Sequence, residues 1–261
     1  MPRREPVWND HAARLVHKTV RGAKGVLTFE APTLAPLLEP GQFVNLEVPG
    51  HVLRRPMAPA SGGGRTFAIV MTARWEGTRD LLNLPLGAEV RVLGPLGNTF
   101  PPPTGRAILV SGGSGAGPLA YLANRLAATG REVVVLHGAR DASEAHLIPL
   151  FARGGARVRY FSEDGAHGEQ GLPTQALPEL LAAGPATVYA VGPEGLMREA
   201  ARLAAAHDAP CYVSLEAHMA CGVGACLSCV HPTTRGTVHL CVDGPIFNAE
   251  EVIWGDEPAQ H

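Results

Sequence analysis

The chain has 261 residues, of which 46% are hydrophobic and 18% are charged, and its formal net charge at pH 7 is -2. This length allows two compact domains, or one domain with appendages. The near-neutral charge argues against a partner such as nucleic acid or an anionic membrane surface. No apolar run approaches the ~18–20 residues that span a bilayer, and the N-terminus lacks the apolar stretch of a signal peptide. We therefore expect a cytoplasmic protein that does not insert into a membrane.

Residues 11 to 100 are expected to form a small antiparallel β-barrel. Short apolar stretches alternate there with turns that contain Gly, Pro and Asn, a pattern typical of such barrels. The expected strands are 11–20, 25–30, 42–48, 66–72 and 88–93. A short helix is expected over 78–84, with Thr78 as its N-cap.

The barrel region contains a candidate phosphate site. Arg54 and Arg55 precede Pro56, and an arginine held by a proline turn could bind a phosphate through a bidentate guanidinium contact. A solvated surface turn is the alternative interpretation of this basic pair. The segment Glu76-Gly77-Thr78 could add backbone and hydroxyl donors at the start of the short helix, so that the two stretches would form one phosphate cradle.

Three consecutive prolines at 101–103 separate the barrel from a region with a different pattern. Apolar strands are expected at 107–110, 132–137, 157–161, 187–191 and 211–215. Helices are expected between them at 118–128, 143–152, 173–183 and 194–207. Continuous apolar runs are typical of strands buried on both faces, and regular alternation of strand and helix predicts a five-stranded, parallel, doubly wound sheet.

A glycine-rich turn follows the first of these parallel strands. Gly112, Gly113, Ser114 and Gly115 stand where the chain passes from strand to helix, so their backbone N–H groups could face a pyrophosphate. The turn does not match the G-x-G-x-x-G fingerprint, and a purely structural turn is the alternative. Its position at the carboxyl end of a central strand favours a nucleotide site.

Four of the five cysteines lie near the end of the chain. Cys221, Cys226 and Cys229 follow the spacing C-x4-C-x2-C, and Cys241 comes later, which is the plant-type pattern for a [2Fe–2S] cluster held by four thiolates. Small residues between them would leave backbone N–H groups free to face the sulfurs. A structural zinc site usually has two close Cys pairs, and disulfides are disfavoured without a secretory signal. The fifth cysteine, Cys211, is expected to be a buried core thiol.

A barrel, a nucleotide-binding sheet and a cysteine loop in this order resemble the ferredoxin-reductase superfamily, and within it the electron-transfer subunits of type B dihydroorotate dehydrogenase. The resemblance spans nearly the whole chain, and its most specific phrases are Ser214-Leu215-Glu216, Met219-Ala220-Cys221-Gly222-Val223-Gly224-Ala225-Cys226 and Cys241-Val242-Asp243-Gly244-Pro245-Ile246-Phe247. It implies an FAD-binding β-barrel domain over 1–103, an NAD-binding α/β domain over 104–215 and a small C-terminal [2Fe–2S] domain over 216–261.

The resemblance also implies the cofactor residues. The family's Arg-Pro-x-Ser flavin motif falls on Arg55-Pro56-Met57-Ala58, where Ala58 replaces the serine whose hydroxyl would face the flavin ring. The other FAD-binding positions are Val70-Met71-Thr72 and Gly77-Thr78. NAD is expected at Gly112-Gly113-Ser114-Gly115, although Ser114 stands where an apolar residue is more usual. The four cysteines would ligate the cluster, and no side chain of this chain is expected to be catalytic.

The function implied by the resemblance is electron transfer in pyrimidine (UMP) biosynthesis. A separate FMN-containing catalytic subunit would oxidise dihydroorotate, and electrons would pass through the [2Fe–2S] cluster and FAD to NAD⁺. FAD stands between the other two groups because nicotinamide exchanges hydride, whereas an iron–sulfur cluster exchanges single electrons. The implied assembly is a heterotetramer with two subunits of each kind. Arg140, after the second parallel strand, could also accommodate the 2′-phosphate of NADP.

Two other functions remain open. The chain could be an NAD(P)H reductase subunit that serves a hydrogenase, a sulfite reductase or a ferredoxin. Small subunits of the ferredoxin:NADP⁺ transhydrogenase type are expected to carry Asp where Cys221 stands, which distinguishes that group. The chain could also be a zinc-stapled binding module without redox activity. Such a module would be colourless, whereas a [2Fe–2S] flavoprotein is brown-yellow and is bleached by dithionite.

Overall fold

The computed structural model describes residues 8–140 and 142–255, which divide into two compact units. Unit 1 consists of the segments Met1–Thr99, Glu216–Val230 and His239–Pro245. Unit 2 consists of the segments Phe100–Leu215, His231–Val238 and Ile246–His261. The chain first passes from unit 1 to unit 2 next to the three prolines. The three domains with boundaries at 103/104 and 215/216 stay a prediction.

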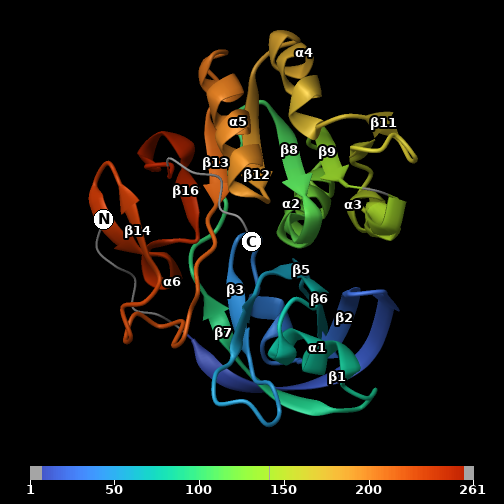
Figure 1. The fold of residues 1–261 in the computed structure, drawn as a ribbon, viewed down its shortest axis with the longest axis vertical. Coiled ribbons are helices and arrows are strands. Elements are labelled where there is room, and N and C mark those ends of the chain that lie inside the picture. Colours follow the sequence, from blue (N-terminus) through green and yellow to red (C-terminus); the bar gives the residue numbers. More distant parts are fainter. Residues whose placement is uncertain (1–7, 141, 256–261) are drawn as a thin grey trace. The chain divides into compact units, whose positions relative to one another are not determined.

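A seven-stranded antiparallel sheet forms the nearly closed barrel of unit 1, with strand order β4-β3-β7-β1-β2-β6-β5 (Figure 1). Its strands are β1 (Asn9–Arg21), β2 (Lys24–Glu30), β3 (Phe43–Leu46), β4 (Arg55–Met57), β5 (Pro59–Ser61), β6 (Thr66–Thr72) and β7 (Glu89–Leu96). All five predicted strands are present. The sequence did not predict β4 and β5, which have three residues each and contain Pro56 and Pro59. These two strands end the sheet on either side, the position in which a strand tolerates proline.

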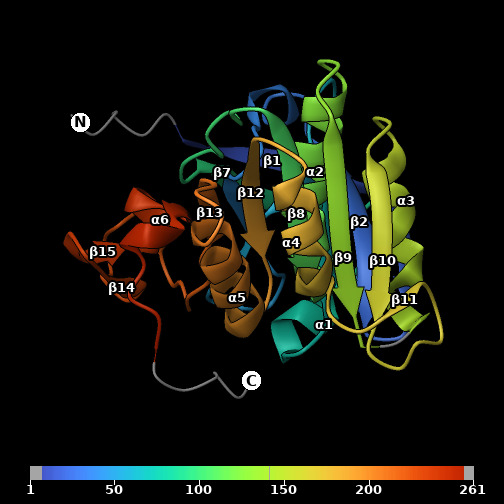
Figure 2. The same cartoon turned by 90° about the horizontal axis from the view of Figure 1, so that it is seen from above.

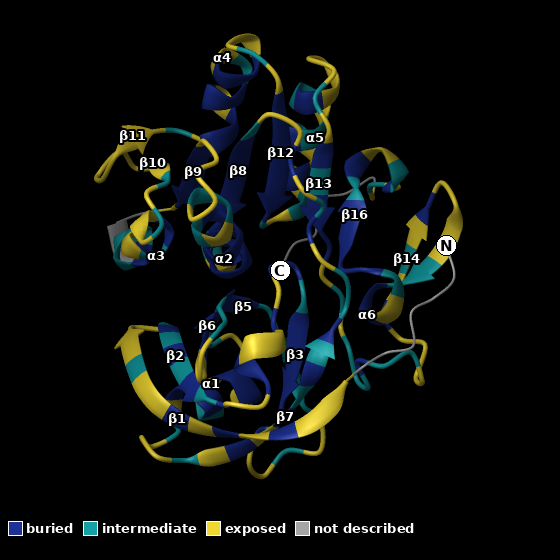
Figure 3. Cartoon of the chain, turned by 180° about the vertical axis from the view of Figure 1, so that it is seen from behind, coloured by how far each residue is buried: buried dark blue, intermediate teal, exposed yellow. Residues whose placement is uncertain are grey.

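The core of unit 1 lies on the inner face of this sheet. Buried and exposed residues alternate from His11 to Leu15 in β1, and buried and half-buried residues alternate along β2, as expected for strands with one face turned to the core (Figure 3). Phe29 and Phe67 stack in the core with ring centroids 5.5 Å apart. A short 3-10 helix, η1 (Ala35–Leu37), follows β2.

The helix of the barrel, α1 (Glu76–Asn83), begins two residues earlier than predicted. Its N-cap is Trp75, so the prediction that Thr78 is the N-cap is wrong. The threonine still satisfies this end of the helix from inside the first turn. Its hydroxyl accepts a hydrogen bond from the Trp75 N–H at 3.1 Å and donates one to the Trp75 carbonyl oxygen at 2.9 Å.

Unit 2 contains the predicted parallel sheet, with strand order β11-β10-β9-β8-β12-β13-β16 (Figure 2). The five predicted parallel strands are confirmed as β8 (Arg106–Gly112), β9 (Val133–Ala139), β10 (Arg157–Ser162), β12 (Ala186–Val191) and β13 (Cys211–Ser214). Every residue of β9 and β12 is buried, because helices cover both faces of the sheet. Two short strands that were not predicted extend it. They are the parallel β11 (Glu169–Gln170) and the antiparallel β16 (Ile246–Asn248).

The helices of unit 2 are α2 (Ala116–Ala127), α3 (Ile148–Ala152), α4 (Leu177–Ala182) and α5 (Glu194–Ala205), with the 3-10 helices η2 (Gly113–Gly115), η3 (Ala142–Leu147) and η4 (Pro173–Ala176). Helix α2 packs against α3, and α4 packs against α5. Figure 2 shows α4 and α5 on the near side of the sheet. The helices predicted at 143–152 and 173–183 each begin as a 3-10 helix. Pro149 and Pro178 stand at the first turns of α3 and α4, where a missing N–H is tolerated.

The last elements are the paired strands β14 (Val230–Thr233) and β15 (Gly236–His239), then α6 (Leu240–Asp243) and η5 (Ala249–Glu251). Strand β15 ends at His239, and Cys241 lies in the short helix α6 that follows. Over residues 8–140 and 142–255, the structure contains no helix with the length and apolar character needed to cross a membrane.

Candidate cofactor sites

The four predicted cluster ligands all lie in unit 1. Cys229 and Cys241 are buried, Cys221 is half-buried and Cys226 is exposed. Cys241 reaches the loop from α6, and the Leu240 N–H next to it donates a hydrogen bond to the Cys229 carbonyl oxygen at 2.9 Å. Two of the predicted ligands are therefore buried together, and another is exposed to solvent.

Backbone N–H groups of the loop point at the sulfurs. Three of them donate to the Cys221 sulfur, with N···S distances of 3.2 to 3.4 Å; the donors are Val223, Ala225 and Cys226. A fourth, from Gly224, donates to the Cys241 sulfur at 3.2 Å. Such donors stabilise negative charge on sulfur, and they are one of the means by which proteins set the potential of an iron–sulfur cluster. The loop residues thus fit a thiolate-held cluster.

Two glycines allow the loop to fold around the cysteine sulfurs. Gly222 has φ +73° and Gly224 has φ +80°, values that favour glycine. A Cβ on Gly224 would lie 2.7 Å from the Val242 Cγ2 atom, and a Cβ on Gly222 would lie 2.9 Å from the Asn45 Nδ2 atom. A larger residue at either position would be strained by the positive φ and would have to displace the neighbouring side chain.

The thiols are arranged as two neighbouring pairs. The pKa of Cys226 is lowered to about 6, first by a hydrogen bond from the Ser228 side chain and further by contacts with Cys221. The pKa of Cys241 is raised to about 12, mainly by burial and next by the neighbouring Cys229 thiol. A [2Fe–2S] cluster takes two protein ligands on each iron, which matches two pairs. In the described part of the chain, no three His, Cys, Asp or Glu side chains are placed to hold one metal ion.

The barrel brings the two predicted phosphate-binding stretches together. A Cβ on Gly77 would lie 2.5 to 2.8 Å from three guanidinium atoms of Arg55, so this side chain lies against the first turn of α1. The Arg55 Nη1 group donates to the carbonyl oxygens of Leu53 and Arg54, at 2.5 and 3.3 Å. Within the described residues Arg55 makes no ion pair, so its charge is not neutralised by a carboxylate there. A guanidinium beside a helix N-terminus is suited to a phosphate.

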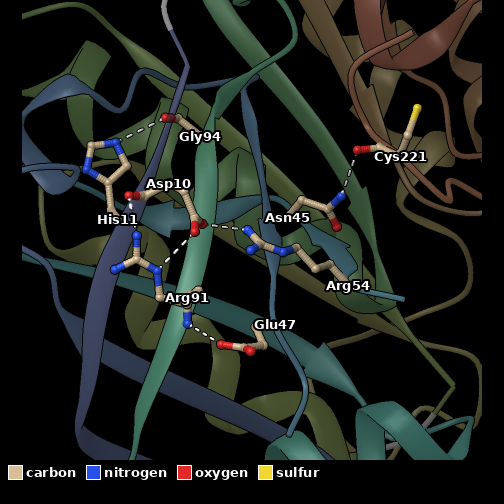
Figure 4. A network of polar contacts seen from close by, with 8 residues as sticks. All are labelled: Asp10, His11, Asn45, Glu47, Arg54, Arg91, Gly94 and Cys221. Carbon is tan, nitrogen blue, oxygen red and sulfur yellow. Dashed lines mark hydrogen bonds and ion pairs between the residues drawn. The ribbon is translucent and has the colours of Figure 1, made fainter. Parts of the chain in front are cut away.

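Arg54, by contrast, is already paired. Its Nη1 group lies 2.7 Å from the Asp10 Oδ1 atom, and Arg91 contacts the other oxygen of Asp10 at 3.0 Å (Figure 4). The pKa of Asp10 is lowered, first by the hydrogen bond from Arg54. The two arginines of the basic pair therefore have different roles, which the sequence did not distinguish.

The remaining predicted flavin positions lie on or beside β6. Val70 and Met71 are buried and Thr72 is half-buried. Strand β5 pairs with β6 through Pro59 and Ile69, which places the half-buried Ala58 alongside the Val70 end of β6. Both the hydroxyl and the backbone N–H of Thr78 hydrogen-bond to Trp75, so both groups already have a partner within the first turn of α1.

Replacing Arg55 with alanine is expected to weaken FAD retention. Loss of a charge-assisted phosphate contact costs ~1.5–3 kcal/mol, or roughly ten- to a hundredfold in affinity. The measurement is the flavin content of the purified variant after extensive dialysis. Arg54→Ala is the matched control and should keep its flavin, because Arg54 is paired with Asp10. Equal flavin content in the Arg55 variant and the parent would refute the assignment.

The predicted nucleotide turn of unit 2 lies at the end of β8. Gly112 ends the strand, and the 3-10 helix η2 leads directly into α2. A Cβ on Gly115 would overlap the Val191 carbonyl oxygen, and one on Gly192 would lie 3.0 Å from the Gly112 nitrogen. The turn thus packs against the chain that leaves β12. The strand order reverses between β8 and β12, and ligands bind at such switch points in open α/β sheets.

Cys211 and Asn45 complete the description of the sites. Burial raises the pKa of Cys211 to about 12, which confirms it as a buried core thiol of unit 2. Asn45 was not predicted. It is 1% exposed in β3, and its Nδ2 atom donates to the Cys221 carbonyl oxygen at 3.3 Å. The signal that could have found it is a single amide in the apolar stretch from Phe43 to Leu46.

Comparison with known proteins gives consistent results. Residues 216–253 match the family model of the iron-sulfur cluster binding domain of dihydroorotate dehydrogenase B. The chain is 34% identical over 216 residues to the dihydroorotate dehydrogenase B (NAD(+)), electron transfer subunit, of Clostridium perfringens, covering 81% of this chain and 86% of that one. It is 36% identical over 239 residues to the subunit of the same name from Geobacillus kaustophilus, covering 87% and 91%.

Solved structures are similar as well. The structure of an NADH-dependent reduced ferredoxin-NADP oxidoreductase, studied for flavin-based electron bifurcation, matches with a TM-score of 0.84 and 27% identity, covering 93% of this chain and 90% of that one. The ferredoxin reductase in carbazole 1,9a-dioxygenase matches with a TM-score of 0.66 and 20% identity, covering 78% and 67%. The second likeness concerns the fold alone.

Proposed function

Because the chain belongs to the family of dihydroorotate dehydrogenase B electron-transfer subunits, we propose that it carries electrons from a dihydroorotate-oxidising partner to NAD⁺. The observation that carries this proposal is the cysteine loop. Its two thiol pairs and four N–H···S hydrogen bonds provide what a [2Fe–2S] cluster needs at the position where the family binds it.

Each cofactor is assigned to its own residues. Cys221, Cys226, Cys229 and Cys241 hold the cluster. FAD lies on the barrel, where Arg55 and the first turn of α1 bind its pyrophosphate. The turn from Gly112 to Gly115 binds the nicotinamide nucleotide. When bound, FAD exchanges hydride with nicotinamide and single electrons with the cluster. The chain's own residues bind and orient these groups, and none of them acts as an acid, a base or a nucleophile.

The partner is an FMN-containing catalytic subunit, and the pathway is pyrimidine (UMP) biosynthesis in the cytoplasm. Support comes from the names of the relatives, which describe one subunit of a larger enzyme. The exposed Cys226 supports it too, because a ligand on the solvent side allows a partner to come close to the cluster. The assembly is a heterotetramer with two subunits of each kind.

A second candidate is a subunit of a ferredoxin-NADP oxidoreductase. The TM-score of 0.84 to such an enzyme favours it. Cys221 argues for the first candidate, because the small subunits of that other group are expected to have Asp as their first ligand. The Cys221 sulfur also accepts three N–H groups here, as a thiolate ligand would.

Co-purification distinguishes between these two candidate functions. The chain is expressed together with the products of the genes next to its own, and the proteins that purify with it are identified. A brown-yellow complex with FMN, FAD, iron and sulfide that reduces NAD⁺ when dihydroorotate is added would support the proposal. The chain alone should show only NADH:dye reductase activity. A complex that reduces NADP⁺ with reduced ferredoxin, and not NAD⁺ with dihydroorotate, would favour the second candidate.

A further inference from the structure

Asn45 is a buried polar residue among apolar neighbours. Phe43, Val44 and Leu46 of the same strand are buried with it, and Asn45 itself is only 1% exposed. An amide in such a place is costly unless its hydrogen-bonding groups have partners. The Oδ1 atom has no hydrogen-bond partner among the described residues. Burial of the unpaired Oδ1 atom is unfavourable, so the presence of Asn45 needs an explanation, and the hydrogen bond of its Nδ2 group is the place to look for one.

The donor of Asn45 contacts the first cluster ligand. The Nδ2 atom donates to the Cys221 carbonyl oxygen at 3.3 Å, as Figure 4 shows. The same atom would lie 2.9 Å from a Cβ on Gly222. Asn45 therefore holds the peptide group that joins Cys221 to Gly222, where the cluster loop begins.

The other end of the site is held by more contacts. The Asn98 N–H donates to the Gly244 carbonyl oxygen at 2.7 Å, and its Nδ2 atom donates to the Asp243 carbonyl oxygen at 3.4 Å. A Cβ on Gly97 would lie 2.7 Å from the Pro245 Cδ atom. The segment after Cys241 is thus fixed by several backbone and side-chain contacts, whereas among residues 8–140 and 142–255 a single amide donates to the Cys221 carbonyl.

The Cys221–Gly222 peptide begins the segment whose N–H groups donate to the Cys221 sulfur. The three N–H donors of Val223, Ala225 and Cys226 follow directly after it, so a rotation of this peptide would redirect the chain that carries them. Donors aimed at sulfur stabilise the added negative charge of the reduced cluster and raise its reduction potential.

We propose that Asn45 is a positioning residue that fixes the Cys221 carbonyl, keeps the three N–H groups on the Cys221 sulfur, and so raises the reduction potential of the cluster. The inference rests on the proposed function, because it needs the cluster at this loop. It adds a residue of the barrel, 176 positions away in the sequence, to the environment of the cluster.

The test uses the full chain with its cofactors and two substitutions, Asn45→Leu and Asn45→Ala. Both remove the N–H donor, but leucine keeps the side-chain volume and alanine does not. Both should lower the equilibrium constant for one-electron reduction of the cluster about tenfold, which is about 59 mV for one electron. A redox titration followed by the paramagnetic resonance signal of the reduced cluster measures this shift, and iron and sulfide content should equal that of the parent.

Asn124→Leu is the matched control. Asn124 also donates to a backbone carbonyl, that of Leu150 at 2.7 Å, and accepts from the Gly154 N–H at 2.8 Å, but it belongs to unit 2. Its loss should lower the melting temperature and leave the cluster potential unchanged.

Three results would overturn the inference. The Asn45 variants could lose stability alone, as the control does, or only the alanine variant could shift the potential, which would indicate packing. Loss of the cluster from both variants with FAD retained would show a role in assembly instead of in potential. A parent protein that binds no cluster would overturn the proposed function itself, which is a separate and recognisable failure.

Discussion

Replacing Cys226 with serine is expected to remove the [2Fe–2S] cluster entirely while FAD stays bound. A hydroxyl is a far weaker cluster ligand than a thiolate at neutral pH, because a serine hydroxyl stays protonated there. The predicted FAD residues lie on β4, β6 and α1, in other segments of the chain. The variant should therefore turn from brown-yellow to the yellow of a flavoprotein.

Absorbance spectra and iron and sulfide analysis of the purified variant measure this result. Cys211→Ala is the matched control, because Cys211 is the cysteine buried in β13 and should have no part in the cluster. Its spectrum should equal that of the parent. Two outcomes would contradict the assignment of separate sites: loss of both chromophores from the Cys226 variant, or full retention of its iron.

Replacing Leu227 with glutamate is expected to stop electron transfer from the partner and to leave both cofactors in place. Leu227 lies between the predicted cluster ligands Cys226 and Cys229 and is 60% exposed, in contrast to the half-buried Val223 of the same loop. Apolar side chains are favoured at the centre of a permanent interface. A charge buried there without a partner costs about 3–5 kcal/mol, so assembly should weaken by more than about a hundredfold.

Two activity assays distinguish loss of contact with the partner from damage to the cofactor sites of this chain. Dihydroorotate-driven reduction of NAD⁺ by the mixed subunits should be lost, whereas NADH:dye reductase activity of the variant chain should persist. Leu86→Glu provides the control, since Leu86 is 61% exposed and lies in the turn before β7, away from the cysteines in the sequence. If the Leu227 variant forms a fully active complex, the cysteine loop is not the docking surface.

The sequence predicted the parallel sheet and most of the barrel because their signals are local. Each of the five predicted strands of unit 2 is a short apolar run beside a helical segment, and such runs need no knowledge of distant contacts. Strands β4 and β5 were missed because a proline in a three-residue strand gives a turn signal. Thr78 was misplaced by three positions because a threonine can satisfy a helix end from the third helical residue as well as from the cap.

The candidate site residues also differ in whether local sequence is enough to identify them. The cysteine spacing is contained in a short stretch, so the sequence predicted all four candidate ligands. The approach of Arg55 to Gly77 could be predicted as a cradle because both stretches carry phosphate-binding residue types. The separate partners of Arg54 and Arg55 could not be predicted, because Asp10 lies 44 positions away. Asn45 meets Cys221 across 176 positions, so the amide among apolar residues in β3 marks the position but does not identify its partner.

The donors that face the Cys221 and Cys241 sulfurs belong to the main chain, and this has an evolutionary consequence. The residues at positions 223 and 225 can be substituted by many other types without loss of the backbone N–H donors. Proline is the exception, since it has no amide hydrogen and would delete a donor outright. Among descendants of this protein, tolerance at these two positions should therefore be broad, with proline excluded.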